Sequence, residues 1–132
     1  RFELVSNHPM ILLDGAHNIQ GVEVFSKAIK QYYPEEKVIL VLGILKDKQS
    51  DEMIKGLLPI AKQIITVTPD NPRALLAIDL AERIQQIAPE MKTMALQSVQ
   101  QAVQWIKERH SQEVIAFTGS LYMIGEVRKI LL

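Results

Sequence analysis

In the segment Ile11-Leu12-Leu13-Asp14-Gly15-Ala16-His17-Asn18, an apolar run ends at a carboxylate and a polar turn follows it. A helical spacing of apolar residues begins after Asn18. This order predicts a buried strand that leads through the turn into a helix. Asn18 is expected to cap that helix, because its side-chain oxygen can accept from the free backbone N–H groups. Polar groups at such a turn are typical of binding sites in α/β proteins, although an ordinary capped turn has the same pattern.

The same alternation continues along the chain. Runs with strand character are Glu3–Ser6, Met10–Asp14, Lys37–Gly43, Gln63–Thr68, Thr93–Gln97 and Val114–Thr118. Segments with helical spacing lie between these runs. Two of the predicted helices have ranges, Asn18–Tyr33 and about Ala74–Ile87. The other three are predicted by their starts: one is capped by Ser50, one has capping-box spacing at Ser98 and Gln101, and one follows Ser120. Residues 38–42 are apolar on both alternating faces, which is typical of a parallel strand covered on both sides.

This alternation predicts a single α/β domain over residues 1–132. Its fold is expected to be Rossmann-like, a doubly wound, mostly parallel sheet with helices on both faces and an N-terminal β-hairpin. Right-handed crossovers bring the strand-to-helix turns to one edge of such a sheet, and ligands bind there. The turns expected at this edge are Asp14–Asn18, Gly43–Ser50, Thr68–Arg73 and Thr118–Tyr122.

Arg1 is predicted to lie opposite Asp14. A hairpin centred between Asn7 and His8 pairs these two positions, and an arginine in this place suits phosphate recognition. A surface ion pair is the alternative. His17 lies beside them in the turn, where it is available to contact a nucleotide, to transfer a proton or to pack against the sheet edge.

The other turns carry the remaining candidates. Asp47 or Lys48 is placed to bind the ammonium or carboxylate group of an amino acid, unless this loop is simply solvated. Two prolines stiffen the loop that presents Arg73, which suits carboxylate recognition, although prolines also terminate strands. Ser120 stands at a helix start that attracts anions, and a plain cap is the alternative.

Composition excludes several classes of protein. The chain has 132 residues, 15 basic and 15 acidic, and no cysteine, so a nucleic-acid footprint, disulfides and thiolate metal sites are not supported. Apolar runs are too short for a membrane span, and the start of the chain has neither signal-peptide character nor an initiator Met. We expect a cytoplasmic domain cut from a longer chain. The sequence contains no P-loop, no Gly-x-Gly-x-x-Gly motif and no metal-ligand spacing.

Together, these segments resemble the C-terminal domain of folylpolyglutamate synthase, a family that often also has dihydrofolate synthase activity and belongs to the Mur ligase superfamily. The resemblance is carried by Arg1-Phe2-Glu3, Leu13-Asp14-Gly15-Ala16-His17-Asn18, Thr118-Gly119-Ser120-Leu121-Tyr122 and Gly125-Glu126-Val127-Arg128. Gly43 with Asp47-Lys48 and Asn71-Pro72-Arg73-Ala74 extend it over nearly the whole chain. The loop after Gly43 departs from the family pattern, because Lys48-Gln49 stands where a second aspartate is common.

The resemblance implies an ATP-dependent ligase in which an N-terminal P-loop domain of the same polypeptide holds most of the ATP and Mg²⁺. Its small-molecule substrates are folate or dihydropteroate, L-glutamate and ATP, and the reaction passes through an acyl phosphate. By this resemblance Arg1, Asp14 and His17 reach the ATP, with Asp14 and His17 in catalytic roles. The glutamate-side cleft is formed by Asp47, Lys48, Arg73, Ser120 and Tyr122. The isolated domain is expected to be inactive.

Two alternatives stay open at this point. Asp70-Asn71-Pro72-Arg73 is also similar to the amino-acid-selecting motif of one class of peptidoglycan-building Mur ligases, but those enzymes usually have tyrosine at position 15 and proline at position 19. The second alternative is a non-catalytic Rossmann-like module that binds a nucleotide or a small anion.

Overall fold

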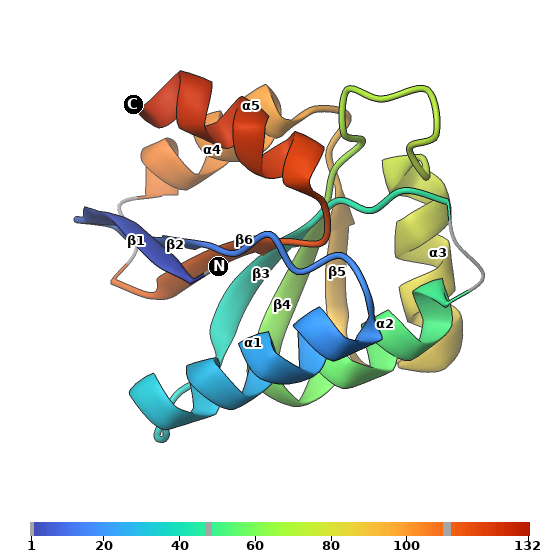
Figure 1. The fold of residues 1–132 in the computed structure, drawn as a ribbon, viewed down its shortest axis with the longest axis horizontal. Helices are drawn as coiled ribbons and strands as arrows, with labels where there is room; N and C mark the ends of the chain where they lie inside the picture. Colours follow the sequence, from blue (N-terminus) through green and yellow to red (C-terminus); the bar gives the residue numbers. More distant parts are fainter. Residues whose placement is uncertain (1, 47–48, 110–111) are drawn as a thin grey trace.

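The computed structural model describes residues 2–46, 49–109 and 112–132, and among these residues it confirms the α/β prediction. Six strands form one sheet in the order β1-β2-β6-β3-β4-β5, and β1 alone runs antiparallel to its neighbour (Figure 1). The strands are β1 (Glu3–Asn7), β2 (Met10–Leu13), β3 (Val38–Leu42), β4 (Ala61–Thr66), β5 (Lys92–Ala95) and β6 (Val114–Thr118).

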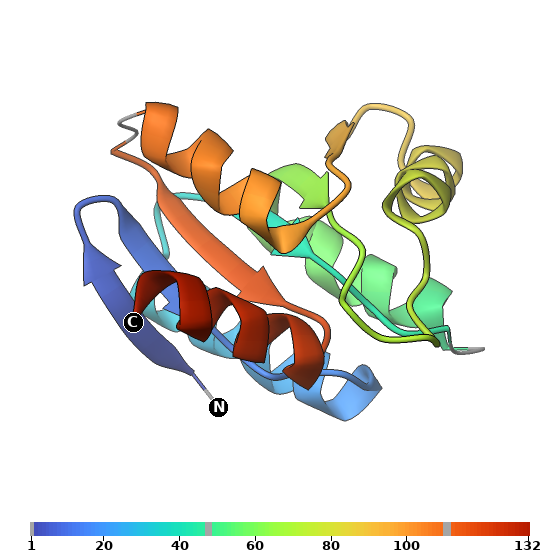
Figure 2. The same cartoon turned by 90° about the horizontal axis from the view of Figure 1, so that it is seen from above.

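Helices of the same chain cover both faces of the sheet (Figures 1 and 2). One face carries α1 (Ile19–Tyr32), α2 (Ser50–Leu57) and α3 (Ala77–Ile87), with a short 3-10 turn at Leu58–Ile60. The other face carries α4 (Val99–Arg109) and α5 (Leu121–Leu131). Both hydrophobic layers are therefore closed within this chain, and we expect it to fold without another domain.

The central strand β3 shows why the sequence selects this architecture. Val38, Leu40 and Leu42 pack in the layer with α1 and α2, whereas Ile39 and Val41 pack in the layer with α4 and α5. All five residues are buried. A strand with two apolar faces is stable only when helices cover both of them, as in a parallel α/β sheet.

Three predicted helix caps are confirmed at the level of hydrogen bonds. Asn18 Oδ1 accepts from the Gly21 N–H at 2.8 Å, and Ser120 Oγ accepts from the Tyr122 N–H at 3.1 Å. Ser98 Oγ accepts from the Gln101 N–H at 3.1 Å, while Gln101 Oε1 accepts from the Gln97 N–H rather than from that of Ser98. The prediction for Ser50 was wrong, because α2 already includes Ser50 and Gln49 occupies the capping position.

The third helix begins at Ala77, three residues later than the sequence pattern predicted. Residues 74 and 75 instead join the loop after β3, through the Leu45–Ala74 bridge and a bond from Leu75 N–H to Ile44 O. Thr68 Oγ1 accepts from the Ala77 N–H at 2.9 Å. A side chain from the preceding loop thus supplies the cap, and no local helix signal could have shown it.

The predicted hairpin exists, but its predicted register was wrong. Glu3 pairs with Leu13 and Asn7 with Met10, with an irregularity between Leu4 and Ser6. A turn centred between Asn7 and His8 would have paired Glu3 with Leu12. The real turn lies one residue further along, and the irregularity shifts the pairing again. Arg1, expected opposite Asp14, lies outside the described residues.

Gly119 lets three turns meet at the end of β6. Its φ is +117°, and a Cβ atom there would lie 2.5 Å from the Gly43 carbonyl oxygen. Its N–H donates to Ala16 O at 3.0 Å, and the Gly43 N–H donates to Thr118 O at 3.3 Å. The turns after β2, β3 and β6 are therefore joined by backbone hydrogen bonds that leave no room for a side chain.

We predict that Gly119→Ala lowers the free energy of unfolding by about 2 kcal/mol or more, because both the positive φ and the contact with a carbonyl oxygen oppose a Cβ atom. Gly125→Ala is the matched control. A Cβ atom at Gly125 meets nothing within 4 Å inside α5, so this change is expected to stabilise by about 0.5–1 kcal/mol. Urea denaturation of the two variants measures both effects. Equal stability of the two variants would contradict this explanation of the turn.

Candidate functional site

The candidate site lies at the edge formed by the carboxyl ends of β2, β6, β3 and β4. The turn after β6 leads into α5 on one face of the sheet, whereas the neighbouring turns after β2 and β3 lead into α1 and α2 on the other face (Figures 1 and 2). Connections that depart to opposite faces leave a crevice at the sheet edge, and ligands bind there in open α/β folds.

A hollow of about 280 Å³ opens at this edge. It brings together four predicted site residues, His17, Arg73, Ser120 and Tyr122, which come from three different turns. Asp14 does not line it. Asp14 borders a neighbouring hollow of about 420 Å³ along α1, and His17 lines both hollows.

His17 is exposed, and one of its ring nitrogens is already engaged. Its Nδ1 lies 3.0 Å from the Gly15 carbonyl oxygen, which can only accept, so this nitrogen carries a proton. The Nε2 atom is then the end of the ring available to a ligand, as an acceptor in the neutral imidazole or a donor in the charged form. A histidine held in this way suits hydrogen bonding or proton transfer at a defined position.

Asp14 is only 6% exposed, and its carboxylate is hydrogen-bonded to the backbone of the turn. Its Oδ1 accepts from the Ala16 N–H at 2.8 Å. This bond fixes the backbone between the end of β2 and His17. The geometry thus gives the Asp14 carboxylate a positioning role within the turn.

The loops after β3 and β4 present two cations to the 280 Å³ hollow. The Lys46 N–H donates to Arg73 O at 2.7 Å, next to the Leu45–Ala74 bridge, so the two loops are joined along their backbones. Lys46 and Arg73 are both exposed, and no carboxylate is present among the described residues that line this hollow. An anionic ligand is therefore favoured there over a cation.

The helix start at Ser120 has a structural role that the sequence left open. Ser120 is 1% exposed, and its hydroxyl oxygen caps α5, so the plain-cap interpretation is confirmed for this oxygen. Its O–H proton is still a possible donor toward the hollow. Tyr122 is exposed, as is its neighbour Leu121, and both contribute apolar surface to the rim.

Some site residues were missed by sequence reasoning, and others cannot be placed. Lys46 lines the hollow but was not predicted as a site residue. The residues predicted in its loop were its neighbours Asp47 and Lys48, and both of these lie outside the described residues. Met53 lines the hollow from α2, and only its inward place in the helical spacing could have indicated it. Ile44, Leu45 and Leu121 complete the apolar part of the lining.

Residues 1–121 match the model of the Mur ligase, glutamate ligase domain family. This chain belongs to that family. A dihydrofolate synthase/folylpolyglutamate synthase of Bacillus subtilis is 38% identical over 131 residues, which are 98% of this chain and 29% of the relative. A folylpolyglutamate synthase of Lacticaseibacillus casei is 32% identical over 139 residues, covering 100% of this chain and 29% of that protein. The resemblance to the folylpolyglutamate synthases is thereby confirmed.

Solved structures of similar proteins have the same fold as this glutamate ligase domain. A folylpolyglutamate synthase from Thermotoga maritima superposes with a TM-score of 0.85 at 28% identity, over 99% of this chain and 30% of that chain. A Yersinia pestis enzyme complexed with AMPPNP and a Mn ion gives a TM-score of 0.85 at 24% identity, over 99% and 30% of the two chains. The chain thus spans about three tenths of the length of its relatives.

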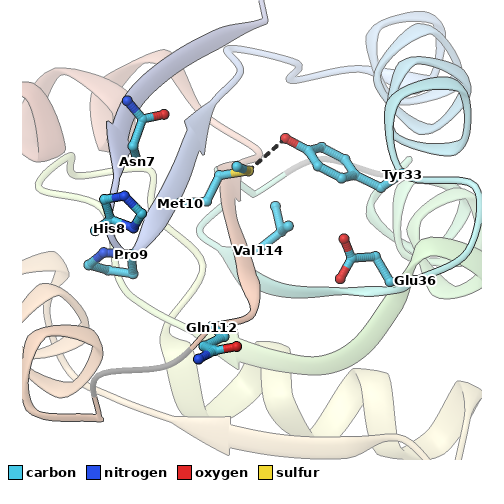
Figure 3. A pocket seen from close by; sticks show the side chains of 8 residues that line it. All are labelled: Asn7, His8, Pro9, Met10, Tyr33, Glu36, Gln112 and Val114. Atoms are coloured by element: carbon cyan, nitrogen blue, oxygen red, sulfur yellow. Dashed lines mark hydrogen bonds between the residues drawn. The ribbon is translucent and has the colours of Figure 1, made fainter.

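A different hollow, of about 510 Å³, lies at the opposite edge of the sheet, beside the hairpin turn (Figure 3). Tyr33 extends toward it from the end of α1, and its hydroxyl lies 2.8 Å from Met10 Sδ. Burial raises the pKa of Tyr33, and the Glu36 carboxylate adds to this effect. This hollow contains none of the predicted site residues and lies across the sheet from them, so it is not part of the candidate site of the glutamate ligase domain.

No group of three His, Cys, Asp or Glu side chains is placed to hold a metal ion among the described residues. No helix within the described ranges combines the length and apolar character that crossing a membrane requires.

Glu126 ties the Arg73 loop to α5, because its Oε2 accepts from the Asp70 N–H at 3.0 Å. Asn71 Oδ1 then accepts from the Arg73 N–H at 2.8 Å and shapes the rest of the loop. We predict that Glu126→Ala speeds hydrogen exchange at the Asp70 amide by about 5–10-fold, the loss expected for one exposed hydrogen bond.

The control is Glu126→Gln, which keeps a carbonyl oxygen at the same place and is expected to retain the protection. Exchange is followed residue by residue with NMR. Identical exchange at Asp70 in both variants would contradict the proposed tie.

Proposed function

We propose that this chain is the C-terminal domain of an ATP-dependent ligase that adds glutamate to folate or to a folyl-glutamate. The observation that carries the proposal is the convergence of His17, Arg73 and Lys46 on one hollow in a glutamate ligase domain. The relatives named above, which are about three times longer than this chain, support the choice of folate and the presence of a further domain.

The described rim fits anionic groups. Lys46 and Arg73 are exposed on joined loops, and an arginine guanidinium can hold both oxygens of one carboxylate. We assign Arg73 to the glutamate substrate. Asp47, Lys48, Ser120 and Tyr122 are assigned to the same cleft by family resemblance. Binding of a carboxylate at this place would orient the amine of glutamate for attack.

We assign His17 and Asp14 to the nucleotide side of the proposed site, and Arg1 to the same side by family resemblance. In this proposal the His17 ring carries a proton on both nitrogens, so Nε2 donates to phosphate oxygens while Nδ1 donates to Gly15 O, which fixes the ring orientation. Asp14 holds the turn that carries the imidazole. Fixed donors of this kind stabilise charge that develops during group transfer, and they need no reorganisation when the reaction occurs.

ATP supplies the phosphoryl group that activates the folate carboxylate, and the amine of glutamate then displaces phosphate from the acyl phosphate to form the amide. The sequence contains no P-loop, and no carboxylate lines the described part of the 280 Å³ hollow. We therefore assign Mg²⁺ binding and most of the contacts with ATP to an N-terminal P-loop domain. The Yersinia pestis enzyme, which includes a domain of similar fold, is complexed with AMPPNP and a Mn ion, which supports the use of ATP and a divalent metal. A cytoplasmic location remains a prediction.

The experiment uses the longer enzyme that contains this chain. We expect ADP release that requires both a folate substrate and L-glutamate, and we expect His17→Ala to lower kcat by about 10²-fold because a positioned donor or proton carrier is lost. His8→Ala is the matched control, since His8 lies at the opposite edge of the sheet, and its kcat is expected to be unchanged.

Other outcomes separate the alternatives. ADP release with peptidoglycan precursors in place of folate would contradict the folate assignment. Ligation by the isolated chain would contradict the need for a second domain. Submicromolar binding of ATP to the isolated chain, measured by calorimetry and lost in His17→Ala, would favour a nucleotide-binding module instead.

A further inference from the structure

A hollow of about 640 Å³ opens on the α4 face, at the amino edge of the sheet and away from the candidate site. Its floor is formed by Ile39, Ile115 and Met94 from three strands, and Trp105 covers it from α4 (orange in Figure 2). Sites for small organic ligands commonly have volumes of about 300–1,000 Å³ with apolar walls. The proposed ligase reaction makes no use of this hollow.

Two polar groups beside the hollow make no hydrogen bond within the part of the chain that the structure describes. The indole N–H of Trp105 is buried and has no partner among residues 2–46, 49–109 and 112–132. Gln63 is only 7% exposed, and no hydrogen bond of its side-chain amide is found within the same ranges. Buried polar groups in folded proteins are nearly always paired, so the indole N–H of Trp105 is an exception beside this hollow, and the nearly buried Gln63 amide is open to a ligand or water.

An irregularity in β4 places Gln63 on this face. Val38 pairs with Ala61 and Ile39 with Gln63, so Lys62 is an additional residue in β4. Ala61 packs in the layer with α1 and α2, and regular alternation would have turned Gln63 toward the same layer. The bulge instead brings Gln63 beneath α4. Bulges frequently redirect a side chain in this way beside binding sites.

Two cations line the same hollow. Lys92 lies on β5 and Arg109 on the last turn of α4, and no ion pair of either is found in the described part of the chain. The Arg109 guanidinium lies 4.4 Å from the centre of the Trp105 ring. The carboxylate of Glu113, also in the lining, is 2.5 Å from Lys62 Nζ. The remaining charge is therefore positive and favours an anion.

We propose that this hollow binds a small organic acid with an apolar body. Lys92 and Arg109 supply the charge for its carboxylate, and the Gln63 amide supplies a hydrogen bond. The apolar body packs on Ile39, Met94 and the Trp105 ring. The combination of an amide, two cations and an apolar floor selects a carboxylate over a neutral or cationic ligand.

The test uses the 132-residue chain, which closes both of its hydrophobic layers and has a single tryptophan, so its fluorescence reports this hollow. The probe is cyclohexanecarboxylate, and the neutral comparison is cyclohexylmethanol. We expect saturable binding of the acid with a Kd below about 1 mM and at least about tenfold weaker binding of the alcohol. The indole N–H signal of Trp105 should shift on binding in ¹H–¹⁵N NMR spectra.

Two variants test the residues directly. Gln63→Leu and Lys92→Met are each expected to weaken binding of the acid by about tenfold or more. Gln63→Leu should not lower the melting temperature, because its amide makes no hydrogen bond within the described residues. The matched controls are Gln104→Leu and Lys107→Met, exposed residues of α4 that do not line the hollow. Their affinity should be unchanged.

The proposal is overturned by any of three results. One is the absence of saturable binding up to about 10 mM acid. Another is equal binding of the acid and the alcohol. The third is an unchanged affinity of Lys92→Met for the acid, because Lys92 is exposed and its replacement is not expected to impair folding. Contact of the indole N–H with water alone, without binding of the probe, counts as the first result.

Discussion

The close approach of Gly119 to the Gly43 carbonyl is the constraint on which the site depends. β6 lies between β2 and β3, so its turn must pass between theirs before entering α5 on the opposite face. Hydrogen bonds from Gly119 N–H to Ala16 O and from Gly43 N–H to Thr118 O lock the three turns together. The hollow that holds His17 and Arg73 is a consequence of this junction. His17 lies on the turn after β2, which the junction fixes directly. Arg73 lies on the loop after β4, which is bonded to the fixed loop after β3.

The two edges of the sheet differ in chemistry for reasons that follow from the topology. At the carboxyl edge, exposed His17, Lys46 and Arg73 stand on turns held by backbone bonds, and the hollow has no carboxylate in its described lining. Such an edge is suited to receive anionic groups presented by another domain. At the amino edge, α4 leaves part of the sheet uncovered, and the bulge at Lys62 turns a buried amide toward that space. The first edge belongs to the proposed ligase reaction, and the second offers a separate place for a ligand.

Local pattern sufficed to predict most of the fold, because a strand with two apolar faces such as β3 requires helices on both sides. The caps at Asn18 and Ser120 were also visible locally. The errors arose where distant segments meet. The third helix starts late because residues 74 and 75 bond to the loop after β3, and the hairpin register follows an irregularity between Leu4 and Ser6. In the site, the convergence of His17, Arg73 and Ser120 was predictable from topology, whereas Lys46 and Met53 depended on packing between loops.

A crystal structure of the longer enzyme with AMPPNP and a folate substrate bound would locate the reaction directly. We expect the nucleotide phosphates and the terminal folate carboxylate to face the carboxyl edge of this sheet, with His17 Nε2 in hydrogen-bond contact with the ligand and Arg73 bordering the same cleft. Ligands bound elsewhere, with His17 and Arg73 facing solvent, would contradict this expectation.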